Sequence, residues 1–430
     1  MASLITLILI LTFPLLPFFL FLHHHQKYRK IIKKKLPPGP KGLPIIGNLH
    51  QLDSSSLYLN LWNLSKQYGP LFSLQLGLRP ALVVSSPRMA KETLKNHDIE
   101  FSGRPSLLGQ KKLTYNGDIF FSPYDDYWRE IRKICVVHIF SSKRVASFSS
   151  IRKFHVLFTE LQAMVGTFFI SDYIPFMGWM DRVRGLIGRL EKNFKEFDEF
   201  YQQVIDEHLH PQRKKLEEED IIDVLLHLKK QRSFSVDLTF DRIKALLVNP
   251  RTMQRVQAEV RELYGKKAFI EEEDIQKLPY LKAVLKETLR LHPPGPLLVP
   301  RETNKDCIIE GYEIPAKTLV YVNAWAIHRD PNAWNDPEEF YPERFLECDI
   351  DFKGQDFKLI PFGAGRRICP GIPMGVITVE LILANLIYSF DWEMPQGMKK
   401  EDIDTEVLPG IAQQKKNPLC LLAKNHVLLV

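Results

Sequence analysis

The chain opens with a long apolar segment and continues as a mixture of helical and strand-like patterns. Residues 4–22 contain 15 large apolar side chains, interrupted only by two threonines and two prolines. As a helix rising about 1.5 Å per residue, this segment spans a hydrocarbon core of about 30 Å. Polar residues follow it, not the small residues of a signal-peptide cleavage site. We therefore expect a retained transmembrane anchor over residues 1–22.

Apolar periodicity later in the chain predicts mostly helices. Residues 278–291 place five apolar side chains on one helical stripe, and residues 252–263 have a helix-forming composition after Pro250. Strand-like runs are shorter: 71–76, 81–84, and a pair formed by 307–314 with 318–322. The expected fold class is mainly α with small β-sheets.

The distribution of charge separates the start of the chain from its body. Six cations follow the apolar segment and none precedes it: Lys27, Arg29, Lys30, Lys33, Lys34 and Lys35. By the positive-inside rule, everything after the anchor lies in the cytosol. Without these six, 52 basic residues face 51 acidic ones. This near-neutral body argues against a nucleic-acid-binding protein.

Two further features define the organisation. Residues 23–44 combine the basic tether with a proline-rich hinge, since the prolines of residues 36–44 exclude regular helix and strand. Residues 45–430 show no repeat or linker, so we expect one large domain. The histidines at 23–25 fit a membrane-surface position better than a metal site. The five cysteines are widely spaced and odd in number, which predicts a reducing compartment without disulfides.

One of these cysteines lies in a segment suited to a metal-bound thiolate. Residues 361–371 read PFGAGRRICPG, and an apolar run over 374–390 follows. The glycines let the backbone approach a large flat ligand and turn N–H groups toward one sulfur, while two arginines add positive charge. Cys369 is therefore a candidate ligand to haem iron. Cys135, Cys307, Cys348 and Cys420 lack this setting and are interpreted as small buried hydrophobes.

This loop resembles the signature F-x-x-G-x-R-x-C-x-G of the cytochrome P-450 family. The fixed positions are Phe362, Gly365, Arg367, Cys369 and Gly371. The likeness extends over most of residues 1–430 and is closest to the plant microsomal A-type enzymes. It implies a P-450-like fold that binds haem b, with Cys369 as the axial ligand whose electron donation favours O–O cleavage. It also implies a flavoprotein reductase that passes electrons from NADPH.

The resemblance assigns roles to further residues. Glu287 and Arg290 match the family's E-x-x-R pair, and Arg344 resembles the third member of a buried network; from spacing alone, a solvated salt bridge is the alternative. Partners for the haem propionates would be Trp128, Arg132, Arg301 and Arg367.

The same resemblance places a substrate pocket within residues 101–117, 293–299 and 409–412. Its candidate lining residues are Pro294, Leu297, Leu298, Val299 and Ile411. These side chains are apolar, which favours a small hydrophobic plant metabolite over a charged one. Ordinary loop packing is the alternative interpretation.

The chain departs from the family at its centre. No A/G-G-x-D/E-T/S motif is present, so the acid and alcohol that deliver protons in the family have no counterpart, and no catalytic residue is identified. Residues 241–247 resemble the start of the helix that carries this motif, but they continue directly into the start of the next helix. We therefore expect one deletion at 247–248 and a second near 151–160.

These patterns support a primary hypothesis and two alternatives. The first is a haem-thiolate monooxygenase, held by a single anchor in the endoplasmic reticulum membrane with its globular domain in the cytosol. The second is a truncated, non-catalytic paralogue or splice form that binds haem poorly or not at all. The third keeps haem but rearranges hydroperoxides; the intact hinge and cysteine loop argue against it.

Overall fold

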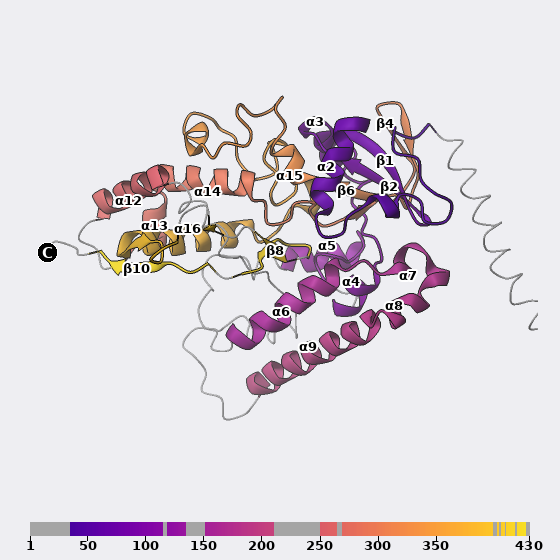
Figure 1. Ribbon diagram of the computed structural model, residues 1–430, viewed down its shortest axis with the longest axis horizontal. Coiled ribbons are helices and arrows are strands. Elements are labelled where there is room, and N and C mark those ends of the chain that lie inside the picture. The colour runs from indigo at the N-terminus through magenta and orange to yellow at the C-terminus, as the bar shows by residue number, and fades with distance from the viewer. Residues whose placement is uncertain are drawn as a thin grey trace, which may run out of the picture.

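The computed structural model describes residues 35–114, 118–134, 151–209, 250–264, 269–398, 402–403, 406–408, 410–417 and 419–426. The expected anchor at 1–22, residues 23–34 of the tether and the expected junction at 247–248 lie outside them. Within them the fold is mainly helical with small sheets, as the sequence predicts. Figure 1 shows the largest sheet at one end, beside the hinge, and the long helices extending away from it.

The helices range from one turn to 24 residues. The longer ones are α2 (Leu57–Tyr68), α5 (Asp126–Ile134), α6 (Ile151–Gly166), α9 (Leu186–Leu209), α12 (Pro250–Tyr264), α14 (Pro279–Leu291) and α16 (Ile372–Ser389). The short helices are α3 (Pro87–Lys91), α4 (Leu108–Leu113), α7 (Ile170–Tyr173), α8 (Trp179–Val183), α13 (Glu272–Ile275) and α15 (Ala324–Ile327). Other helical turns are η1 (Leu49–Gln51), η2 (Glu92–Asn96), η4 (Pro175–Met177), η5 (Pro342–Phe345) and η6 (Gly365–Arg367).

The strands form one four-stranded sheet and three two-stranded ones in the described part of the chain. The larger sheet has the order β1 (Leu71–Leu76), β2 (Arg79–Val84), β6 (Leu319–Val322), β3 (Arg301–Glu302), in which β2 and β6 run parallel. The small sheets pair β4 (Cys307–Ile309) with β5 (Tyr312–Ile314), β7 (Phe390–Glu393) with β10 (Leu422–Asn425), and β8 (Val407–Leu408) with β9 (Gln414–Lys415).

One predicted strand pairing is wrong. The sequence predicts that residues 307–314 pair with 318–322, but residues 307–314 fold back on themselves as the β4–β5 hairpin. The turn uses Glu310 and Gly311, both with positive φ, 51° and 76°. Two such residues match the twist of a tight hairpin. Residues 319–322 are thereby left to join β2 and β3.

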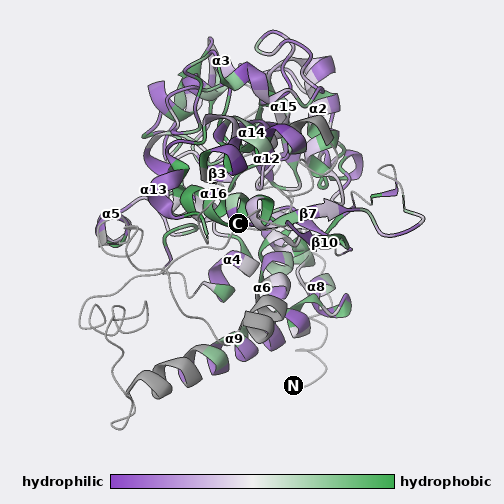
Figure 2. Ribbon diagram, turned by 90° about the vertical axis from the view of Figure 1, so that its left-hand side faces the viewer, coloured by the Kyte–Doolittle hydropathy of each residue, from purple (hydrophilic) through white to green (hydrophobic). Residues whose placement is uncertain are grey.

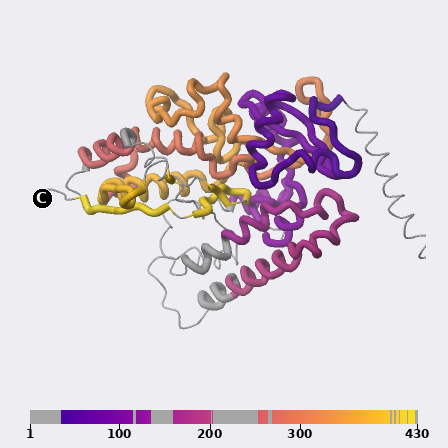
Figure 3. Tube along the Cα trace, in the orientation of Figure 1, coloured from indigo at the N-terminus to yellow at the C-terminus, as the bar shows by residue number. Residues whose placement is uncertain are grey.

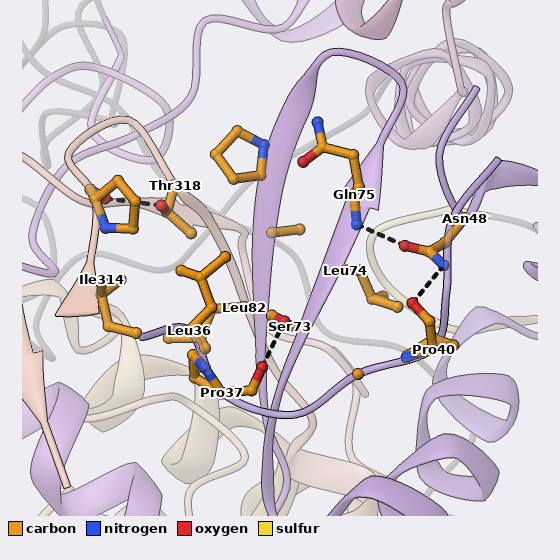
Figure 4. Close-up of a pocket in the computed structure, with 15 residues that line it drawn as sticks. Leu36, Pro37, Pro40, Asn48, Ser73, Leu74, Gln75, Leu82, Ile314 and Thr318 are labelled. Carbon is orange, nitrogen blue, oxygen red and sulfur yellow. Dashed lines mark hydrogen bonds between the residues drawn. The ribbon is translucent and has the colours of Figure 1, made fainter. Parts of the chain in front are cut away.

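The proline-rich hinge is fixed against the edge of the larger sheet. Ser73 of β1 donates two hydrogen bonds to it, from its N–H to Pro38 O at 2.8 Å and from its hydroxyl to Pro37 O at 2.7 Å. A Cβ on Gly39 would lie 2.0 Å from Ser73 O, so only glycine permits this approach. A small pocket remains between the hinge, Asn48, strands β1 and β2, and residues 314–318 (Figure 4). The hinge is thus part of the folded domain.

Helix α16 lies at the centre of the helical half. Leu383 and Ile387 pack against Val256 and Val260 of α12 and against Leu281 of α14, all of them buried. Figure 2 shows its hydrophobic ribbon enclosed by neighbouring elements. Within the described residues it is also the one helix long and apolar enough to cross a membrane. Its packing identifies it as a core helix.

Helices α4, α6 and α9 form a separate packed unit, visible in Figure 3 as the magenta segments beneath the rest of the trace. Leu113, Met164 and Leu190, one from each helix, share a buried cluster. Gly109 of α4 lies so close to α6 that an added Cβ would be 2.5 Å from Met164 O. Residues 151–160, where the second deletion is expected, belong to the unbroken helix α6.

Candidate functional site

The Cys369 loop is a compact turn between η6 and the N-terminus of α16. The Cys369 N–H donates to Phe362 O at 3.0 Å and closes the loop. The Phe362 ring packs edge-on against Phe352, with 5.6 Å between ring centroids. Gly371 is the N-cap of α16, and its N–H donates to the cysteine sulfur. The loop therefore presents the sulfur at the positive end of an 18-residue helix.

The electrostatics of Cys369 suit a sulfur that binds a metal. Burial raises the pKa of the thiol, whereas the Gly371 N–H and the charge of Arg132 lower it, and the net direction is upward. A buried thiol of this kind stays protonated on its own, but a coordinating metal ion deprotonates it outright. The hydrogen bond and the helix terminus then stabilise the thiolate.

Four arginines gather beside this loop from different parts of the chain. They are Arg104, Arg132, Arg301 and Arg367, of which sequence reasoning missed Arg104. Arg301 donates to Phe101 O and Ala364 O at 3.3 and 2.9 Å. Arg367 donates to Ser102 O and Ser122 O at 2.8 and 2.9 Å. Arg104 joins the loops by donating to Phe120 O, Val299 O and Pro300 O.

Burial acts against the charged form of three arginines in this cluster. Burial lowers the pKa of Arg301 to about 10 and that of Arg367 to about 9, and Arg301 and Arg132 add repulsion at Arg367. The pKa of Arg104 is well below its usual range because of burial, Arg367 and Arg301. Asp98 and Asp118 oppose these effects in part. Arg367 Nη1 is buried with no hydrogen-bond partner.

A haem group fits these residues. Its two propionates would supply negative charge beside the buried arginines and an acceptor for Arg367 Nη1. Its iron would take the Cys369 sulfur as ligand. Among the residues that the structure describes, no group of three His, Cys, Asp or Glu side chains could hold a bare metal ion.

The indole of Trp128, a predicted propionate partner, contacts the backbone and two arginines of the site. Its Nε1–H donates to Ile119 O at 2.8 Å. Two of the cluster arginines lie near its ring, with Arg367 4.0 Å and Arg132 5.3 Å from the ring centroid. The structure thus gives Trp128 a cation–π role in positioning arginines.

The structure brings Glu287, Arg290 and Arg344 together. Arg290 forms a two-pronged pair with the Glu287 carboxylate at 2.7 and 2.8 Å, and both side chains are fully buried. Arg344 Nε and the Tyr341 N–H donate to the same carboxylate at 3.2 and 2.8 Å. Arg290 also donates to the carbonyls of His328, Pro337 and Glu339. The solvated salt bridge considered from spacing alone is therefore wrong.

The candidate pocket residues divide between three places. Pro294 and Ile411 are neighbours, because Gln413 N donates to Pro294 O at 2.7 Å and Ile411 joins the cluster of α4, α6 and α9. Leu298 packs toward the core beneath the Cys369 loop, whereas Leu297 packs against the larger sheet. Val299 contributes its carbonyl to Arg104.

Comparisons with known proteins agree with this geometry. Residues 37–156 and 242–422 match the family model described as Cytochrome P450. The chain is 42% identical to a 6,7,8-trihydroxycoumarin synthase of Pastinaca sativa, covering 98% of this chain and 99% of that protein. It is 42% identical to a strychnine-11-hydroxylase of Strychnos nux-vomica, covering 94% of each. A zebrafish cytochrome P450 structure with progesterone superposes with a TM-score of 0.67 at 25% identity, covering 86% of this chain and 99% of that one.

Proposed function

The chain belongs to the cytochrome P450 family, whose members use haem iron, and we propose that Cys369 is the ligand through which this chain holds it. The observation that carries this proposal is the convergence of the Cys369 sulfur, at the α16 N-terminus, with the buried side chains of Arg301 and Arg367, the second of which has a buried N–H group without a hydrogen-bond partner. When bound, haem would supply the oxygen chemistry of a monooxygenase. The chain's own residues would hold the sulfur, bind the propionates and orient the substrate.

The test compares Cys369→Ala with Cys420→Ala, a control at a cysteine that is exposed and not buried as the sequence predicts. Each full-length protein is reconstituted with haem, and its reduced carbon monoxide difference spectrum is recorded. We expect the control to keep the thiolate-type Soret band and the Cys369 variant to lose it. A Cys369→Ala protein that retains the band would contradict the assignment.

We further propose that the substrate is a small hydrophobic plant metabolite, oxidised with electrons that a reductase takes from NADPH. The apolar side chains of Pro294, Leu298 and Ile411 support this class. The names of two relatives, a coumarin synthase and a strychnine hydroxylase, support the same class. Binding is tested by spectral titration with coumarins, with amino acids as the charged controls; tighter binding of the charged controls would contradict the proposal.

A second candidate function, a truncated form with little activity, is supported by the alignments. The match to the coumarin synthase spans 505 aligned positions, whereas this chain has 430 residues, so at least 75 positions of that alignment have no residue here. The family match is also interrupted between residues 156 and 242. We propose that the positions without a residue in this chain account for the deletions expected at 247–248 and 151–160, which lie near the two edges of the unmatched residues 157–241.

For location, we propose a single-pass anchor in the endoplasmic reticulum membrane with the folded domain in the cytosol. Three large apolar side chains support a membrane-facing side: Phe176, Trp179 and Val183 are 47%, 62% and 77% exposed, beside exposed Arg182 and Arg184. The segment that carries these side chains contacts the β1–β2 turn, because the Leu78 N–H donates to Tyr173 O. The chain just after the hinge contacts the same turn, because the Gly77 N–H donates to Ile46 O. Protease added to intact microsomes should digest the domain; a protected domain would contradict this topology.

A further inference from the structure

His328 is a fully buried histidine that lies between two parts of the site. It follows α15 in the chain and has 0% of its surface exposed. Both ring nitrogens have a partner: Nδ1 lies 3.1 Å from Arg290 O, and Nε2 lies 2.9 Å from the Ile360 nitrogen. The imidazole therefore bridges the end of α14 and the segment that leads into the Cys369 loop.

The partners determine which nitrogen carries the proton. A carbonyl oxygen can only accept, so Nδ1 must be the donor to Arg290 O. The Ile360 N–H can only donate, so Nε2 must carry the lone pair. The ring is thus neutral, and burial together with the charges of Arg329 and Arg290 lowers its pKa to about 3. His328 keeps one tautomer and both hydrogen bonds throughout the neutral pH range.

Each side of the bridge continues into a part of the site. On one side, Arg290 Nη1 donates back to His328 O at 2.9 Å, so the histidine is joined twice to the residue that pairs with Glu287. On the other side, Ile360 O accepts from the Gly363 N–H at 3.0 Å, and Phe362 O accepts from the Cys369 N–H at 3.0 Å. Consecutive hydrogen bonds therefore lead from the Glu287 network to the cysteine.

We propose that His328 is a positioning residue for Cys369, because it transmits the fixed position of the buried Glu287–Arg290 pair to the start of the cysteine loop. This inference rests on the proposed function, because it takes Cys369 to be the residue that binds haem. The hydrogen bond to Ile360 is the essential one, since it holds the loop itself. A histidine that only filled space would not require the hydrogen bond to Ile360.

Two substitutions separate the two hydrogen bonds. The amide of asparagine is two bonds from Cβ, as Nδ1 is, so His328→Asn keeps the donor to Arg290 O and loses the acceptor for Ile360. The amide oxygen of glutamine is three bonds from Cβ, as Nε2 is, so His328→Gln keeps that acceptor. The control is His50→Asn, at an exposed histidine of η1.

The first measurement needs no haem. Hydrogen exchange of peptides that cover residues 359–369 is followed in each full-length protein. We expect exchange to accelerate about tenfold in His328→Asn and to stay near that of the wild type in His328→Gln and His50→Asn. Equal acceleration in both His328 variants, or none in either, would overturn the proposal.

The second measurement adds haem and records the share of thiolate-type Soret absorbance in the reduced carbon monoxide complex. We expect His328→Asn to lose most of it and His328→Gln to keep most of it. Equal loss in both variants would overturn the positioning role. If the wild type binds no haem, the proposed function fails, and the exchange experiment still decides whether His328 holds the loop.

Discussion

Four donors converge on the carboxylate of Glu287. They are two nitrogens of Arg290, Nε of Arg344 and the N–H of Tyr341, at 2.7 to 3.2 Å. A fully buried carboxylate persists only when its charge is paired and its lone pairs are satisfied, and Glu287 meets both conditions. Arg367 near Cys369 presents the opposite case, since burial lowers its pKa and its Nη1 is buried without a hydrogen-bond partner. The Glu287 network is therefore structural, whereas the arginines near Cys369 are suited to bind an anion.

At this scale we predict that Glu287→Gln is strongly destabilising. The amide removes the negative charge and points N–H groups at two guanidinium ions, which leaves buried cations unpaired. Loss of one partner in such a pair costs about 3–5 kcal/mol. Urea unfolding measures this loss in the free energy of unfolding. The control is Glu393→Gln, because Glu393 pairs with Lys424 at the surface, and its substitution should cost at most about 1 kcal/mol. Similar losses in the two variants would contradict the distinction.

At the scale of the element, the cysteine loop depends on the backbone of η6. Gly365 has φ of 67°, and a Cβ there would lie 2.1 Å from Leu94 O. The close approach holds η6 against η2. Asp98, just after η2, also accepts a hydrogen bond from the Arg366 N–H. Positive φ and lack of space therefore act together at this position of the signature.

We predict that Gly365→Ala disrupts the loop far more than Gly397→Ala. Gly397 has φ of 82° but nothing within 4 Å of an added Cβ, so its substitution adds backbone strain of about 1–2 kcal/mol. At Gly365 the steric overlap adds about 1–3 kcal/mol or more. Thermal unfolding and the carbon monoxide spectrum report stability and sulfur position. If both variants keep the thiolate-type band equally, the close contact at Gly365 is not essential.

At the scale of the whole molecule, the central deletion that we propose matters more than any single side chain. The family's acid and alcohol have no counterpart in the sequence, and the alignment with the coumarin synthase has 75 more positions than this chain has residues. A helix of that region would bury two or three faces. Its loss would remove apolar burial from that part of the core.

We therefore predict that the 430-residue form oxidises NADPH with little product. Without placed proton donors and with open access of water, electrons should reduce dioxygen to hydrogen peroxide instead of supporting insertion into substrate. The test reconstitutes the protein with haem and a plant reductase, then compares product and peroxide with the NADPH consumed for a panel of coumarins and alkaloids. Product equal to the NADPH consumed would refute the prediction and imply another source of protons.

Local patterns carried much of this protein's description without any structure. Periodicity located α14, because a buried helix face repeats every three or four residues. Helix-forming composition after Pro250 located α12, and the spacing around Cys369 identified the family. Tertiary packing was needed for the rest. It turned residues 307–314 into a hairpin, paired Trp128 with Ile119 O, and brought Arg104 and His328 to the site. Those contacts join residues far apart in the chain, and no local pattern encodes which distant carbonyl or N–H a side chain will meet.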